Sequence, residues 1–222
     1  MGFGDLPYDV AHMLGGAMLL ISFVLLYQRR IAAVVKALAL QGVLLALAAV
    51  WQGYVQGAPQ LYITGAIALV AKGILIPLFL RRLVATLAPE RRAEAASGIG
   101  LSMLIGVLLV ALSILVVLPA TAGARALARE DLAIALSIVL LGLLMMVTRR
   151  SAIAQVAGLM TLENGLVLAA VGVAGMPLII ELSTAGLVLV IAVIAGVFAR
   201  LLRERFDSLD TSVLDPHRGE GQ

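Results

Sequence analysis

The sequence contains no cysteine, which excludes disulfide bonds, iron–sulfur clusters held by thiolates and cysteine-based zinc sites. Histidine is nearly as scarce, because His12 and His217 stand at opposite ends of the chain without metal-ligand spacing. Aromatic residues make up 5% of the chain and charged residues 13%. We therefore expect no bound cofactor or metal and no catalytic centre belonging to this chain alone.

Apolar side chains dominate instead. Hydrophobic residues account for 62% of the sequence, and the mean hydropathy is +1.10, whereas soluble proteins contain about 45–50% apolar residues. A membrane-spanning helix needs about 20 residues, so the chain has room for about seven or eight spans and no sizeable soluble domain. Residues 1–13 carry no basic side chain, so we expect no cleavable signal peptide.

The apolar runs predict an all-α, polytopic membrane protein of about seven transmembrane helices. We place these helices at residues 9–27, 31–51, 60–81, 97–118, 131–148, 152–174 and 177–200. Residues 1–200 would then form a single transmembrane domain, and residues 201–222 a short tail.

Arginine residues gather in alternate connections between these spans. The first, third and fifth connections and the tail contain Arg29, Arg30, Arg81, Arg82, Arg91, Arg92, Arg149, Arg150, Arg200, Arg203, Arg205 and Arg218, and the opposite side has only Arg125 and Arg129. The positive-inside rule therefore predicts an N-terminus outside the cell and a cytoplasmic C-terminus. Because the basic residues act as topology signals, we expect no nucleic-acid partner.

Glu163 is the most unusual residue, since it lies near the middle of the uncharged stretch 151–180. A charge at mid-bilayer costs from about 2.5 kcal/mol on insertion scales to more than 10 kcal/mol in simulations. Lys72 reaches a similar depth from the opposite side, because both residues lie about eleven or twelve positions into their spans. The sequence does not show whether their helices are neighbours.

Two interpretations of Lys72 and Glu163 follow. In the first, they form an ion pair that fixes helix assembly, each charge offsetting the burial cost of the other. In the second, Glu163 belongs to a proton relay, because a nearby Lys72 favours the ionised carboxylate and a distant one favours the protonated form.

Three further residues are assigned supporting roles near this pair. Pro77 has no N–H and leaves the carbonyl of Gly73 without its helical partner, which predicts an irregular helix beside Lys72. Asn164 is expected to form a hydrogen bond between helices. Gln41 is expected either to do the same directly or to join the network through water.

Carboxylates near the predicted helix ends have simpler explanations. Glu181 follows Pro177 in the first turn of the last span, where the helix dipole favours a carboxylate, although a role at a proton exit is the alternative. The dipole also accounts for Glu130 and Asp131, and His12 is most simply an interfacial side chain.

Three segments carry a resemblance to a known family. The penultimate span region, RRSAIAQVAGLMTLENGLVLA, the third-span segment VAKGILIPLFL, and the tail RLLRERFDSLDTSVL resemble the hydrogenase 4 component E family. Members of this family are membrane subunits of formate hydrogenlyase-type complexes. The last three helices, at about residues 131–200, are similar to the K subunit of respiratory complex I and to its counterpart in multisubunit sodium/proton antiporters.

The resemblance implies a non-catalytic subunit of a redox-coupled complex that moves protons or sodium across the bacterial cytoplasmic (inner) membrane. Implied partners are antiporter-like and other membrane subunits, with peripheral hydrogenase or dehydrogenase subunits as indirect ones. Glu163 takes the place of the membrane carboxylate in the second K-subunit helix. The K subunit has another carboxylate in its third helix, but residues around Gly186 and Leu187 here are uncharged, so a complete relay within this chain is not implied.

Other functions stay open. A self-sufficient secondary transporter would need internal repeats and a substrate site on broken helices, and the available buried polar groups are few. A purely structural subunit would use Lys72 and Glu163 only to hold helices together. A retinal protein would also have seven helices and a buried lysine, but the third-span lysine and the scarcity of aromatic residues argue against it.

Overall fold

The computed structural model describes residues 6–87, 98–121, 126–149 and 151–172, and its regular elements there are all helical. They are α1 (Leu6–Tyr27), α2 (Ile31–Gln56), α3 (Gln60–Ala68), the π-helix η1 (Leu69–Leu75), α4 (Ile76–Leu87), α5 (Ile99–Ala120), α6 (Ala126–Thr148) and α7 (Ala152–Gly172).

Six stretches of the described residues are long and apolar enough to cross a membrane. They are Asp9–Tyr27, Ile31–Gln56, Gln60–Arg82, Ile99–Ala120, Arg129–Thr148 and Ile153–Gly172. The prediction of an all-α, multi-pass membrane protein is thus confirmed at this level. The seventh predicted span, residues 177–200, and the tail lie outside the described residues.

The second predicted span ends too early, at residue 51. Helix α2 continues to Gln56, because the polar side chains beyond Trp51 find partners on other helices: Gln52 donates to Asp131 at 3.4 Å and Gln56 to the carbonyl of Val171 at 2.9 Å. The helix ends only at Gly57, whose φ of 63° suits the left-handed C-cap position.

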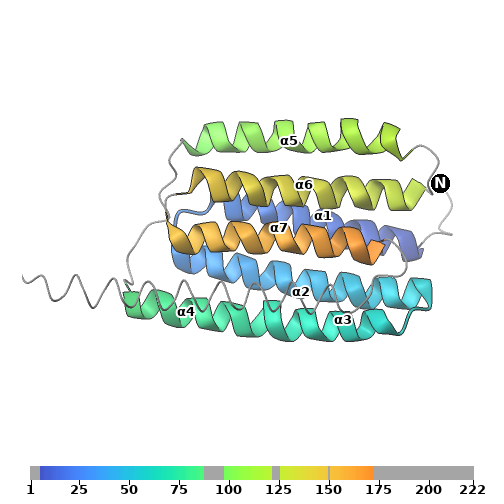
Figure 1. Ribbon diagram of the computed structural model, residues 1–222, viewed down its shortest axis with the longest axis horizontal. Helices are drawn as coiled ribbons and strands as arrows, with labels where there is room; N and C mark the ends of the chain where they lie inside the picture. Colours follow the sequence, from blue (N-terminus) through green and yellow to red (C-terminus); the bar gives the residue numbers. More distant parts are fainter. Residues whose placement is uncertain (1–5, 88–97, 122–125, 150, 173–222) are drawn as a thin grey trace, which may run out of the picture.

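The helices lie side by side along the long axis of the molecule (Figure 1). Helix α5 forms one edge, and the continuous crossing made by α3, η1 and α4 forms the other. Between these edges, α2 packs against α1, α3, η1 and α7, and α6 packs against α1, α5 and α7. Helices α2 and α7 are therefore in contact, and α2 also contacts η1, which brings the segments of Lys72 and Glu163 together.

The contact between α6 and α7 depends on glycine. A Cβ added to Gly142 would lie 2.4 Å from the backbone nitrogen of Leu162, and one added to Gly165 would lie 2.8 Å from the backbone nitrogen of Val139. The two backbones approach each other too closely for any larger residue at these positions, as is common where helices associate in lipid. This packing fixes α7 on both sides of Glu163.

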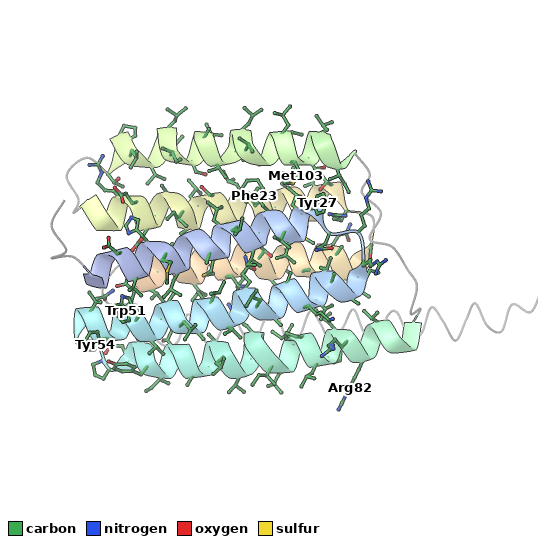
Figure 2. All side chains as sticks on the ribbon, turned by 180° about the vertical axis from the view of Figure 1, so that it is seen from behind. Phe23, Tyr27, Trp51, Tyr54, Arg82 and Met103 are labelled. Atoms are coloured by element: carbon green, nitrogen blue, oxygen red, sulfur yellow. The ribbon has the colours of Figure 1, made fainter. Side chains whose placement is uncertain are left out.

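The two ends of the bundle carry different labelled side chains. Trp51 and Tyr54 lie at one end, with their ring centroids 5.8 Å apart, and Arg82 lies at the other (Figure 2). Arg149 lies at the Arg82 end as well, where its guanidinium donates to the carbonyl of Leu26. Burial, together with the nearby charge of Arg29, lowers the pKa of Arg149.

Replacing Gly142 with alanine should destabilise the protein by about 1–3 kcal/mol, because the new methyl group collides with the backbone of α7. Gly16 is the matched control, since a Cβ there meets nothing within 4 Å. Unfolding measured in mixed detergent should therefore give a lower free energy of unfolding for Gly142→Ala than for Gly16→Ala. Equal stability of the two variants would contradict the close α6–α7 contact.

Candidate functional site

Lys72 and Glu163 form an ion pair inside the bundle. The Nζ atom of Lys72 lies 3.1 Å from Oε1 of Glu163, and each residue is only 5% exposed. Lys72 belongs to η1 and Glu163 to α7. The sequence predicted equal depth for the two charges, and the structure adds that they are in contact.

Lys72 projects from a segment of altered helical pitch. In η1 the N–H of Ile76 bonds to the carbonyl of Ala71, five residues earlier, and Pro77 follows in the first turn of α4. Such single-turn π segments interrupt the regular hydrogen-bond ladder and often occur at functional positions. The predicted irregularity beside Lys72 is therefore confirmed, and it takes the form of a widened turn.

A glycine on α2 allows the backbone of Lys72 to come close. A Cβ added to Gly42 would lie 2.7 Å from the carbonyl carbon and oxygen of Lys72 and 2.9 Å from the nitrogen of Gly73. Any larger residue would push η1 away from α2. Gly42 was not predicted as a site residue. The only sign of it in the sequence is that a small residue directly follows Gln41.

The ion pair leaves some acceptor atoms unsatisfied. Oε2 of Glu163 and Oδ1 of Asn164 are buried and accept no hydrogen bond from the described residues. Nζ of Lys72 lies close enough to Oε1 of Glu163 for an ion pair, but the geometry of this contact is not that of a hydrogen bond. A buried ion pair stabilises a fold best when hydrogen bonds satisfy its remaining lone pairs, and the described residues supply none to Oε2 of Glu163.

A chain of hydrogen bonds continues from Asn164 across two more helices. The Asn164 amide donates to Oε1 of Gln41 at 3.1 Å, and the Gln41 amide donates to the hydroxyl of Ser22 at 2.8 Å. Ser22 in turn donates to the carbonyl of Met18 at 2.9 Å. The predicted hydrogen bond of Asn164 between helices is confirmed, and Gln41 takes part directly. Ser22, a lone hydroxyl in an apolar run, was missed.

The structure therefore brings Lys72, Glu163, Asn164 and Gln41 into one buried region, with Pro77 just beyond η1. Glu181 lies outside the described residues. Within the ranges that the structure describes, no group of three or more histidine or acidic side chains has the arrangement of a metal site. The chemistry available here is proton or small-cation exchange on a single carboxylate.

No family model matches the chain, and no solved structure matches it. It is 30% identical over 201 residues to a protein of Mycobacterium tuberculosis, Uncharacterized protein Rv0085, in a match that covers 90% of this chain and 91% of the relative. The chain belongs to the family of that protein. Because the match covers 90% of this chain, it includes the segments that contain Lys72 and Glu163.

The amide chain between α1, α2 and α7 gives a stability prediction. Gln41→Leu and Asn164→Leu should each destabilise the protein by about 1–2 kcal/mol, since each leaves a buried partner unsatisfied. The double variant should lose less than the sum, because the second substitution removes a group that is already unpaired.

Unfolding of the single and double variants in detergent measures this coupling. Ser113→Ala is a control partner, since its hydroxyl bonds to the carbonyl of Leu109 within its own helix. Gln41→Leu combined with Ser113→Ala should be additive. Additivity of Gln41→Leu with Asn164→Leu would contradict the contact between the two amides.

Proposed function

We propose that this chain is a non-catalytic membrane subunit of a complex I-related, redox-coupled complex that translocates protons or sodium, of the hydrogenase or formate hydrogenlyase type. Its own contribution is a buried proton relay formed by Glu163 and Lys72, together with scaffolding of neighbouring subunits. The complex resides in the bacterial cytoplasmic membrane, with the N-terminus outside and the arginine-rich end of the bundle in the cytoplasm.

The observation that carries this proposal is the incompletely satisfied ion pair. Glu163 has a cation 3.1 Å from one carboxylate oxygen and no hydrogen-bond donor among the described residues for the other. The lone pairs of Oε2, which no donor in the described part of the chain engages, provide a position for a proton. The single lysine beside it provides the charge that controls when the proton is bound.

The relay works through the distance between the two side chains. While Lys72 is close, its ammonium group stabilises the Glu163 carboxylate and the proton leaves. When Lys72 moves away, the carboxylate remains in an apolar environment and takes up a proton on Oε2. Moving one charge across the full membrane at 100 mV changes its free energy by about 2.3 kcal/mol. This energy is comparable to a change of one or two pH units in proton binding.

Lys72 is well positioned for such a movement because it lies in η1. A π segment and a regular α segment differ by one residue in their hydrogen-bond register, and therefore in the direction of the side chains they contain. The long methylene stem of the lysine adds further reach. Antiporter-like subunits and other membrane subunits of the complex would continue the path beyond Glu163, and the peripheral hydrogenase would supply the energy.

A structural subunit is the second candidate, because the same ion pair also joins α7 to η1. Exchange of the two residues separates the candidates. In the variant Lys72→Glu/Glu163→Lys the attraction between the helices persists, but the carboxylate moves to the other helix. A structural role predicts normal assembly and normal translocation by this variant.

The experiment is gentle purification of the native complex, identification of the co-purifying subunits, and measurement of proton translocation in vesicles with and without sodium. Glu163→Gln should assemble normally and lower translocation by about 100-fold, the typical contribution of one positioned proton-transfer group. The exchanged variant should also assemble and should also fail to translocate.

Lys36→Gln is the matched control for Lys72→Gln, since Lys36 is a lysine in the preceding span but is exposed. It should leave translocation unchanged. Translocation by Glu163→Gln at the wild-type rate would refute the relay. Loss of assembly in Glu163→Gln that Lys72→Gln restores would establish the structural role, and activity of the isolated chain in liposomes would indicate an independent transporter.

A further inference from the structure

A second polar cluster lies at the end of the bundle that carries Trp51 and Tyr54. It comprises His12 of α1, Gln52 of α2, and Glu130 and Asp131 of α6, and we call it the His12 cluster. Gln52 is adjacent to Trp51, which Figure 2 shows at this end. Helix dipoles and interfacial position account for these residues one at a time, but they do not explain why three helices place them together.

The two ring nitrogens of His12 face different carboxylates. Nε2 contacts Oε2 of Glu130, and Nδ1 lies 3.8 Å from Oδ1 of Asp131. A neutral imidazole has only one N–H, whereas the imidazolium ion donates from both nitrogens. Each ring nitrogen of His12 thus has a carboxylate on its own side, with a hydrogen-bond contact at Nε2 and a longer ion-pair separation at Nδ1.

The members of the cluster lead from the surface to the interior. The side chain of Glu130 is 57% exposed, that of His12 31% and that of Asp131 10%. Beyond Asp131, its other oxygen, Oδ2, accepts from the Gln52 amide at 3.4 Å, and Gln52 accepts from Gln56 at 3.0 Å. A proton taken up at the exposed end thus has an ordered series of acceptors as far as a buried carboxylate.

A small cavity lies beside the buried end of this series, where α1, α2, α6 and α7 meet. Its volume is about 10 Å³, and its polar lining comes from Asp131 and Gln52, with Gly15, Ala48 and Leu168 among the apolar residues around them. This volume is close to the minimum that holds one water molecule, and the two polar side chains supply hydrogen-bond partners for it.

We propose that the His12 cluster is a proton-binding site that exchanges protons with the aqueous phase at this end of the bundle. A proton passes from Nδ1 of the imidazolium to Oδ1 of Asp131, which leaves a neutral imidazole and a carboxylic acid. The neutral imidazole keeps its other proton on Nε2, towards Glu130, and Nδ1 then accepts the next proton from solvent. No other reactant is needed, and the net charge changes only when a proton enters or leaves.

The cluster suits a proton better than a metal cation. Sodium or calcium ions require five or more oxygen ligands, and the cavity offers only the oxygens of one carboxylate and one amide among the described side chains that line it.

Few other charges face the cluster. Helix α1 adds Asp9 in its first turn, and α6 adds Arg129, whose guanidinium is directed to the carbonyl of Leu118 on α5. Helix α2 contributes amides only. The described part of α7 near the cavity contributes Leu168 and Gly172, which carry no charge. Among the described residues, the titratable side chains that make up the cluster are therefore His12, Glu130 and Asp131.

This site is distinct from Glu163, because fully buried apolar side chains lie between the two polar regions. On α2, Leu45 and Ala49 separate Gln41 from Gln52 and are 0% exposed, and Ile138 of α6 is also 0% exposed. Proton binding at the His12 cluster consequently does not depend on the relay. It remains even if Glu163 proves to be structural.

The test is a pH titration of His12 by nuclear magnetic resonance, using the full chain labelled at histidine and reconstituted in lipid nanodiscs. His217→Gln leaves His12 as the sole histidine, since the sequence contains two. Asp131→Asn and Glu130→Gln should each move the titration midpoint of His12 to lower pH by about one unit, because each removes a neighbouring anion.

Asp9→Asn is the comparison on the same helix, because Asp9 is exposed to solvent one turn before His12, where its charge is screened, and this variant should shift the midpoint less. Glu163→Gln should leave the midpoint unchanged, which separates this site from the proposed relay. Equal shifts of the His12 midpoint in Asp131→Asn, Glu130→Gln and Asp9→Asn would overturn the proposal. A larger shift of the midpoint on addition of sodium than in Asp131→Asn would also overturn it.

Infrared titration of the unsubstituted cluster, in the His217→Gln chain, keeps the proposal testable if Asp131→Asn fails to fold. Groups that share protons titrate as a unit, so a carboxyl band should change over the same pH step as the His12 resonance. A single histidine step without any carboxyl change would contradict a shared proton.

Discussion

The cost of placing charge in an apolar bundle is the constraint on which this structure depends. Neither Lys72 nor Glu163 is stable alone at mid-membrane depth, so η1 and α7 must lie within reach of each other. That requirement accounts for local features that otherwise look unrelated. Gly42 lets the backbone of η1 approach α2, and the widened turn of η1 interrupts the helix at the lysine.

The rest of the bundle fixes the position of this pair. Glycines at the α6–α7 contact hold α7 on both sides of Glu163, and the amides of Gln41 and Asn164 join α2 to α7 beside it. Towards the end with Trp51 and Tyr54, fully buried apolar side chains such as Leu45 and Ile138 lie between this pair and the His12 cluster. The described part of the protein thus has two polar regions with mainly apolar, fully buried side chains between them.

The sequence predicted the features that follow from hydropathy and depth. The six described spans, the equal depth of Lys72 and Glu163, and the irregular helix before Pro77 were all accessible, because they depend on position along a single helix. Which helices lie next to one another could not be predicted from the sequence. The end of α2 was placed too early because Gln52 and Gln56 look like loop residues until their partners on α6 and α7 are known. For the same reason, the residues of the His12 cluster were explained separately and not as one group.

The central claim is that Glu163 binds and releases a proton while the complex works. Time-resolved infrared difference spectroscopy of the native complex, started by its electron donor, measures this directly. The account predicts a carboxylic acid band that appears and disappears with turnover and is missing from Glu163→Gln. A spectrum in which Glu163 stays ionised throughout turnover, with bands identical in the two proteins, would contradict it.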